Sequence, residues 1–169
     1  MYFPTLADFE TWFDVESDKV KLDDMVNQTG PFVRPTVEPG EPPWSVKWLL
    51  FFKDDKYLRL NENYYRRSSH SGGGAHRAQF SFHYGNIPPK RYGSLAWQKE
   101  EQVDLRFDLD GRIGPHIHFN GEDHILQSRV SGIQVTDQTM FTFIEGIRMH
   151  RQSGAPLETV FGFKVNPIK

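Results

Sequence analysis

Two histidines, His116 and His118, stand one residue apart and are the side chains of this sequence best suited to chemistry. Successive side chains of an extended strand alternate between its faces, so both imidazoles would project from the same side. Apolar residues fill the alternate positions, and the dipeptide Asn120-Gly121, which is typical of a two-residue hairpin turn, follows directly. The pattern therefore predicts a hairpin whose first strand presents an imidazole pair.

The strand after this turn decides what the pair could do. With a two-residue turn, Asp123 lies opposite His118 and His124 points to the other face, which gives a histidine–carboxylate pair suited to acid–base chemistry. With a three-residue loop, His124 lies opposite His118 instead, and three imidazoles could hold a metal ion such as Zn²⁺. His83 is an alternative third ligand. A third interpretation treats these residues as ordinary packed or surface histidines.

Composition and register restrict the partners of the pair. The sequence contains no cysteine, which excludes thiolate ligands, disulfides and a cysteine nucleophile. We expect the nearest carboxylate to be Asp123, or one of Asp104 and Asp108 in the preceding strand. An ideal two-residue turn at Asp110-Gly111 would put the histidines on the apolar face, so a bulge at Gly114-Pro115 is expected to return them to the polar face.

Charge is distributed unevenly along the chain. Residues 1–41 carry nine acidic and three basic side chains, whereas residues 56–92 carry seven basic side chains and one acidic side chain. Aromatic and basic residues alternate in the second segment, a mixture that can follow a phosphate backbone and stack bases. A charged edge strand is the alternative interpretation. The expected nucleic-acid-binding residues are Tyr64, Tyr65, Arg66, Arg67, Arg77, Lys90 and Arg91.

The sequence predicts one helix near each end and several strands between the two helices. A helix is predicted from about Thr5, and a second one begins after a cap at Thr136 or Asp137 and stops before Gly154. Apolar residues alternate at period two in several segments between the helices, and a last strand is predicted over residues 157–165. The type of the charged stretch from Asp14 to Asp24 stays open between helix and strand.

These elements predict an α+β fold, with a single strongly bent antiparallel β-sheet and a helix near each end. The length of 169 residues favours one domain, in which residues 1–43 form an acidic, proline-rich N-terminal helix and connector and residues 44–169 form the sheet-plus-helix core. The longest apolar run is too short to cross a membrane, and no signal peptide is recognised. We therefore expect a cytoplasmic protein without a membrane partner.

Three motifs resemble the TumE-like toxins of prokaryotic toxin–antitoxin systems. They are an aromatic-Ser-aromatic-His-aromatic strand, a basic-aromatic-Asp strand and a Pro-His strand, which here read Phe80-Ser81-Phe82-His83-Tyr84, Arg106-Phe107-Asp108 and Pro115-His116-Ile117-His118. The resemblance covers about residues 48–127. It implies a toxin-like protein that acts on RNA or its machinery and that could have a protein partner such as an antitoxin.

The resulting functional hypothesis is an RNA-directed, metal-independent nuclease or its inactive relative, which needs no cofactor. His118 would act as general acid or base, with His116 or His83 as its counterpart, and the phosphate would be stabilised by Arg106 or Arg129. Asp123 would orient His118. The alternatives are a non-catalytic module that binds nucleic acid or protein through a basic face and, third, a metal-binding protein that holds Zn²⁺ through His116, His118 and His124.

Overall fold

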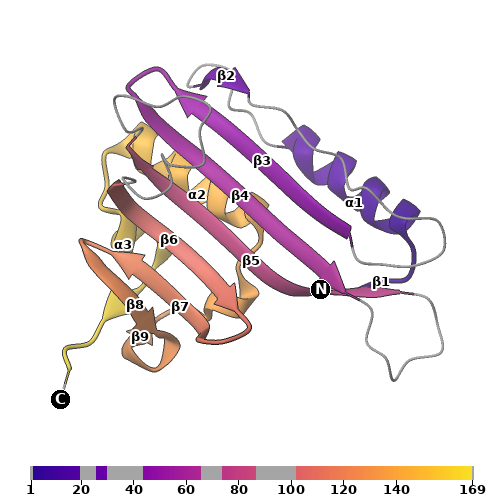
Figure 1. The fold of residues 1–169 in the computed structure, drawn as a ribbon. Coiled ribbons are helices and arrows are strands. Elements are labelled where there is room, and N and C mark those ends of the chain that lie inside the picture. Colours follow the sequence, from indigo (N-terminus) through magenta and orange to yellow (C-terminus); the bar gives the residue numbers. More distant parts are fainter. Residues whose placement is uncertain (1, 20–25, 30–43, 66–73, 87–101, 169) are drawn as a thin grey trace.

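An antiparallel sheet with two helices on one face organises the computed structural model, which describes residues 2–19, 26–29, 44–65, 74–86 and 102–168 (Figure 1). The strand order is β2-β3-β4-β5-β6-β7-β8, and β1 pairs with the start of β5. The sheet is strongly curled but not closed, which confirms the α+β prediction. The strands of this sheet are β1 (Tyr2–Phe3), β2 (Val26–Thr29), β3 (Trp44–Phe52), β4 (Lys56–Tyr65), β5 (Ala75–Asn86), β6 (Gln102–Asp110), β7 (Gly114–Phe119) and β8 (Glu122–Leu126).

The first helix, α1 (Leu6–Lys19), begins where the sequence predicts it. The Thr5 hydroxyl accepts a hydrogen bond from the Asp8 amide, while the Asp8 carboxylate accepts from the Thr5 amide, so the two residues form a capping box. The helix continues through part of the charged stretch whose type the sequence left open. Its aromatic side chains pack on the sheet, with Phe9 against Tyr64 and Phe13 against Trp48.

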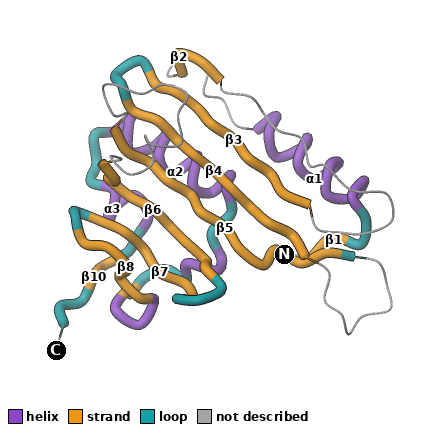
Figure 2. The backbone as a smooth tube through the Cα atoms, in the orientation of Figure 1, coloured by secondary structure: helices purple, strands orange, loops and turns teal. Residues whose placement is uncertain are grey.

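The second helix, α2 (Met140–Ser153), covers the same face of the sheet (Figure 2). Its N-cap is Thr139, whose hydroxyl accepts from the Thr142 amide, and not Thr136 or Asp137 as the sequence predicted. The earlier residues form a separate 3₁₀ turn, Val135–Asp137, which explains why a capping residue there does not begin the α-helix. Phe143 is fully buried and lies against Phe82 in the aromatic core.

The prediction of a last strand over residues 157–165 is wrong for most of its length. The segment forms a short helix, α3 (Leu157–Phe161), and only then a two-residue strand, β10 (Lys164–Val165), which pairs with β9 (Val130–Ser131). Phe161 packs against the helix surface at Gly146, where a Cβ atom would lie 2.3 Å from its ring. Helical packing on α2 thus prevails over the local alternation of apolar residues.

The two faces of the sheet differ in character. The helix-covered face carries buried apolar side chains of β3 to β7, among them Leu50, Leu60, Phe82, Phe107 and Ile117, whereas polar side chains occupy the opposite face in cross-strand rows set by the register. One row runs through Asn61, Ser81, Asp108 and His116. The next row runs through Arg59, His83, Arg106 and His118.

The turn between β6 and β7 contains three residues, because Asp110 pairs with Gly114. The ideal two-residue turn at Asp110-Gly111 is therefore not formed. The Asp110 carboxylate accepts hydrogen bonds from the amides of Arg112 and Ile113, and Gly114 takes the left-handed φ of 82° that ends the turn. A turn of three residues, unlike one of two, places His116 and His118 on the polar face of the sheet. The bulge expected at Gly114-Pro115 would have had the same effect.

No helix within the described ranges is long and apolar enough to cross a membrane.

Candidate metal centre

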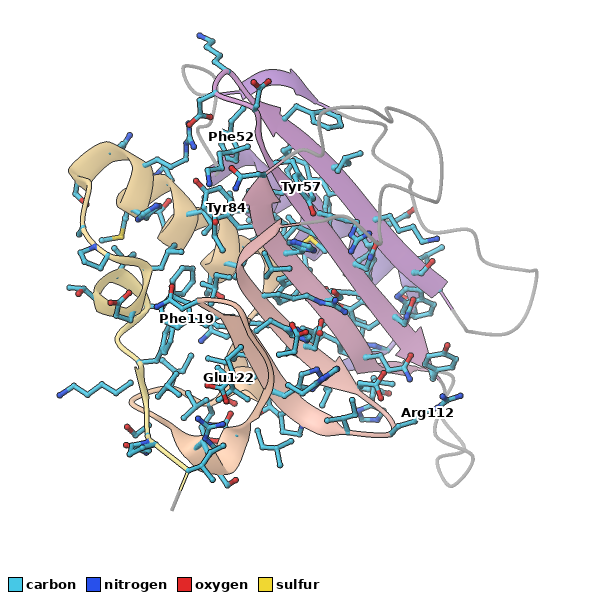
Figure 3. All side chains as sticks on the ribbon, turned by 60° about the vertical axis from the view of Figure 1, so that its left-hand side comes forward. Phe52, Tyr57, Tyr84, Arg112, Phe119 and Glu122 are labelled. Atoms are coloured by element: carbon cyan, nitrogen blue, oxygen red, sulfur yellow. The ribbon has the colours of Figure 1, made fainter. Side chains whose placement is uncertain are left out.

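His116 and His118 project together from β7 on the polar side of the sheet, which confirms the prediction that they share a face near a carboxylate. Cross-strand pairing places His116 opposite Asp108 and His118 opposite Arg106. Both imidazoles and the Asp108 side chain are buried, with exposed fractions of 2%, 6% and 3%. In Figure 3, Arg112 marks the turn before β7 and Phe119 marks its end, so the pair lies on the strand between these labels.

A β-bulge in β8 adds two further side chains to this pair. The hairpin turn has two residues, since Phe119 pairs with Glu122, but the register then shifts so that Asp123 and His124 both oppose His118. His124 has a left-handed φ of 54°. Asp123 therefore reaches His118 as the two-residue turn predicts, while the prediction that His124 points to the other face is wrong.

The three imidazoles form a compact cluster. His124 is exposed, and its ring centroid lies 5.2 Å from that of His116 and 4.8 Å from that of His118. Each of the three offers one nitrogen, and these nitrogens all lie within 4.8 Å of one another. The bulge thus produces the three-histidine arrangement that the sequence connected with a three-residue loop.

Hydrogen bonds fix which nitrogen of each buried imidazole is free to bind a ligand. His116 Nδ1 lies 2.9 Å from the Gly114 carbonyl oxygen, and His118 Nδ1 lies 2.8 Å from the Asp123 carboxylate. Both partners only accept hydrogen bonds, so each Nδ1 carries a proton and each neutral ring keeps a lone pair on Nε2. Metal-bound histidines are usually held in this way, by a carbonyl or carboxylate at the other ring nitrogen.

The two Nε2 atoms converge on one oxygen of Asp108. Its Oδ2 lies 3.4 Å from His116 Nε2 and 3.3 Å from His118 Nε2. Bonds of 2.0–2.1 Å in a tetrahedral zinc site imply ligand separations of about 3.3–3.4 Å. Among the described residues, neither Asp108 Oδ2 nor His118 Nε2 has a well-aligned hydrogen-bond partner, although Arg106 Nε lies 2.7 Å from Oδ2.

The negative charge of Asp108 lies between the positive charge of Arg106 and the imidazole of His118. Burial opposes its ionisation, but the neighbouring His118 and Arg106 outweigh that effect and hold the pKa of Asp108 below its usual value. Burial likewise opposes protonation of His118, yet Asp108 and Asp123 raise the pKa of this imidazole above its usual value. The point between these groups therefore favours a positive charge, supplied by a proton or by a metal ion.

Arg106 and His83 lie near the cluster in different environments. Arg106 Nε donates to Asp108 Oδ1 over 3.0 Å and lies 2.7 Å from Oδ2, so it orients this carboxylate. His83 is the cross-strand neighbour of Arg106, but its ring is fully buried and lies 3.0 Å from the Tyr57 hydroxyl. The structure therefore places Arg106 beside the cluster and His83 one strand farther away.

Arg129 does not join the cluster. Its guanidinium pairs with Glu122, whose side chain belongs to the β7–β8 hairpin labelled in Figure 3, and its Nε donates to the Asn166 carbonyl over 3.1 Å. These contacts attach the C-terminal segment to the hairpin. The prediction that Arg129 stabilises a phosphate at the histidines finds no support in this arrangement.

Two residues expected to bind nucleic acid are located inside the protein. Tyr64 is fully buried and donates a hydrogen bond to Glu62, and the Arg77 side chain, with only 5% exposed, forms an ion pair with the same carboxylate. A nucleic-acid contact through either side chain would require the core to open there. Tyr65 is exposed. The other expected residues, Arg66, Arg67, Lys90 and Arg91, lie outside the described residues.

The sequence indicated most members of the cluster but not their arrangement. Strand period two was sufficient to place His116 and His118 together and to present Asp108 as one candidate carboxylate. It could not show that Asp108 faces both imidazoles, because that depends on the length of the β6–β7 turn. The signal for His124 would have been a bulge, which has no fixed sequence pattern when the left-handed residue is not glycine.

Comparisons with protein families, with curated proteins and with solved structures found no match. The similarity to TumE-like toxins therefore remains an expectation from three short motifs.

Proposed function

We propose that the protein binds one divalent transition metal ion, such as Zn²⁺, through His116, His118 and His124, with Asp108 as an oxygen ligand beside them. The observation that supports this most strongly is that two Nε2 atoms lie 3.4 Å and 3.3 Å from one buried carboxylate oxygen, separations typical of ligands in tetrahedral coordination. A cation between these atoms would satisfy all three at once. Asp123 and the Gly114 carbonyl would orient the two buried imidazoles.

The position of the cluster favours a reactive centre over a purely structural one. Structural zinc sites are closed, whereas catalytic sites keep a position for water or substrate. Here His116 and His124 line an open pocket of about 240 Å³, so water could reach the ion as a fifth ligand beside the three histidines and Asp108. A Zn²⁺ ion held there would lower the pKa of a bound water to about 7 and so would supply a nucleophile for hydrolysis. We therefore assign the reaction class as metal-dependent hydrolysis.

A second candidate function rests on the position of His118 between two carboxylates. A proton in place of the metal would make His118 a cationic general acid beside Arg106, two groups that a metal-independent ribonuclease could use. RNA is then the substrate, and His116 is the second acid–base group. This function and the metal function use the same atoms, so a single set of measurements distinguishes them.

The decisive variant is His124→Gly. Glycine adopts left-handed φ values without the cost of a side chain, so this substitution removes a ligand while it preserves or stabilises the bulge. Asp55→Gly is a matched control, because Asp55 also has a left-handed φ, of 59°, in the distant β3–β4 turn. The measurements are metal content by mass spectrometry and thermal unfolding with zinc and with chelator.

We expect the wild-type protein and Asp55→Gly to hold about one zinc ion per chain. A free metal concentration of 100 times the dissociation constant stabilises the fold by about 2.7 kcal/mol, which raises Tm by about 5–10 °C in a protein of this size. His124→Gly should lose most of that increase. Unchanged melting with chelator, together with RNA cleavage that survives chelation and disappears in His118→Ala, would replace the metal proposal with the acid–base one.

A further inference from the structure

The pocket beside the histidine cluster extends across the polar face of three more strands. Its floor includes two cross-strand rows, one through Asn61, Ser81 and Asp108 and the other through Asn63 and Gln79. The cluster closes one end, and the amides of Asn61 and Asn63 on β4 lie at the other. Neighbouring strands are about 4.8 Å apart, so about 14 Å separates the backbones of β4 and β7, and a ligand must bridge the part of this distance that the side chains leave open.

The charges around the pocket do not favour an anionic ligand. Arg106 is the one cation among the described residues that line it, and this guanidinium is paired with Asp108. Asp110 also lines the pocket, with its carboxylate engaged by the amides of the β6–β7 turn. Without a metal ion the two carboxylates outweigh Arg106 by one negative charge, and with a divalent ion the excess becomes one positive charge that is located at the cluster. A phosphate group at the far end of the pocket would find no side-chain cation among these lining residues.

Uncharged hydrogen-bonding groups dominate the end away from the cluster. Asn61, Asn63 and Gln79 are half-buried, and within the described parts of the chain their side-chain amides form no hydrogen bond. An amide both donates and accepts, as does a hydroxyl group. These three side chains could therefore bind several hydroxyl groups of one ligand.

The size of the pocket restricts the ligand further. A volume of about 240 Å³ lies below the ~300–1,000 Å³ of sites for drug-sized molecules. That volume suits a single ring. The side chain of Ile113, which is 44% exposed, borders the pocket and offers an aliphatic surface to the apolar face of such a ring.

We propose that this pocket binds a neutral, polyhydroxylated ligand the size of one sugar ring, held by Asn61, Asn63 and Gln79 and with one hydroxyl group directed at the histidine cluster. The contact at the cluster rests on the proposed metal centre. The contacts at the amides do not depend on it, because those side chains lie on β4 and β5, away from the proposed ligands.

The test uses the full chain after its metal content has been measured. Binding of D-glucose, D-galactose, D-ribose and myo-inositol is followed by saturation-transfer NMR and calorimetry, with glucose-6-phosphate, AMP and inorganic phosphate as charged comparators. Gln79→Ala and Asn61→Ala remove amides, and Gln134→Ala is the control because Gln134 is exposed and does not line the pocket.

We expect at least one neutral compound to bind more tightly than every charged comparator. Each amide variant should weaken that binding about three- to tenfold, since one neutral hydrogen bond contributes about 0.5–1.5 kcal/mol, while metal content and the Gln134→Ala control stay unchanged. Tighter binding of the phosphorylated compounds, equal binding by the amide variants, or no binding by any neutral compound would overturn the proposal. A metal-free protein that still binds a neutral compound through these amides would refute the metal centre and retain the pocket.

Discussion

At the scale of single residues, His118 is the side chain on which the candidate centre depends most. Its Nδ1 contacts Asp123, and its Nε2 faces Asp108 across 3.3 Å. The two carboxylates differ in environment, because Asp108 is buried and Asp123 is 73% exposed. Asp123 can therefore be changed without opening the core, which makes its influence on the metal measurable on its own.

Asp123→Ala should weaken zinc binding about 10- to 100-fold, the usual effect of removing a group that orients a metal-bound histidine. The reason is that His118 loses the acceptor that holds its proton on Nδ1. Competition with a chromophoric chelator measures the affinity. Glu122→Ala is the matched control, since Glu122 is the neighbouring acidic residue and pairs with Arg129 instead; an equal loss of affinity in both variants would contradict a specific role for Asp123.

Side-chain alternation along a strand was enough to predict the pair His116 and His118 and to offer Asp108 and Asp123 as partners. The placement of His124 could not be predicted in the same way. One extra residue in β8 reverses which face a side chain occupies, and the sequence gives no glycine at that position to indicate it.

At the scale of elements, the turn between β6 and β7 sets the face on which the histidines appear. Asp110 holds the turn through two backbone amides, and Gly114 ends it with a φ of 82°. A turn with one residue more or fewer would direct the imidazoles into the apolar core. The turn is therefore as important for the site as the ligands themselves.

Gly114→Ala should destabilise the fold by about 1–2 kcal/mol, the cost of a left-handed conformation for a residue with a Cβ atom. Urea denaturation measures this change, and zinc titration should show weaker binding because the Gly114 carbonyl also holds His116. Gly111→Ala in the same turn is the control. Its added Cβ would lie 3.2 Å from the flexible end of Gln79, which can move aside, so a destabilisation equal to that of Gly114→Ala would refute the explanation.

Other element predictions show the same limit of local patterns. The helix over residues 140–153 was recognised from its apolar spacing, but its start depended on which of several threonines made the capping box with Thr142. Apolar and polar residues alternate after Pro156 as they would in a strand, yet the segment forms a helix because the Phe161 ring packs against Gly146 of α2. In both cases a contact outside the local pattern decides the boundary.

At the scale of the whole molecule, a buried ion pair connects the sheet to the start of α2. Arg77 on β5 pairs with Glu62 on β4 over 3.0 Å and donates to the carbonyl oxygens of Thr136 and Gln138. Tyr64 donates to the other oxygen of Glu62 over 2.6 Å. Burial raises the pKa of Glu62 above its usual value, despite the opposing effects of Arg77 and Tyr64.

Arg77→Met should destabilise the protein by about 3–5 kcal/mol at pH 8, because it leaves a buried carboxylate without its cation. A raised pKa means that the folded state favours the protonated carboxyl of Glu62. The contribution of Glu62 to the free energy of unfolding is therefore fully present at low pH, and it is lost as the pH rises from about 4.5 through the folded-state pKa. The deficit, which is the loss of unfolding free energy in Arg77→Met relative to wild type, should therefore be smaller at pH 5 than at pH 8.

The control is the double variant Arg77→Met with Glu62→Gln, measured by urea denaturation at both pH values. Glutamine cannot ionise, so the pH-dependent part of the deficit should disappear. A deficit of Arg77→Met that is independent of pH, or one that grows on acidification, would show that Glu62 is not the group responsible.

The β-bulge of β8 and the short turn before β7 also bear on how the protein folds. Asp108 and His124, the outermost proposed ligands, are separated by only 16 positions in the chain, and two tight turns connect them. Closing so short a segment costs little conformational entropy, so the β6–β7–β8 unit can form before the long-range pairing of β1 with β5. An unfolded chain would then retain some affinity for zinc, and the rise in Tm on zinc binding would underestimate how tightly the native protein holds the ion.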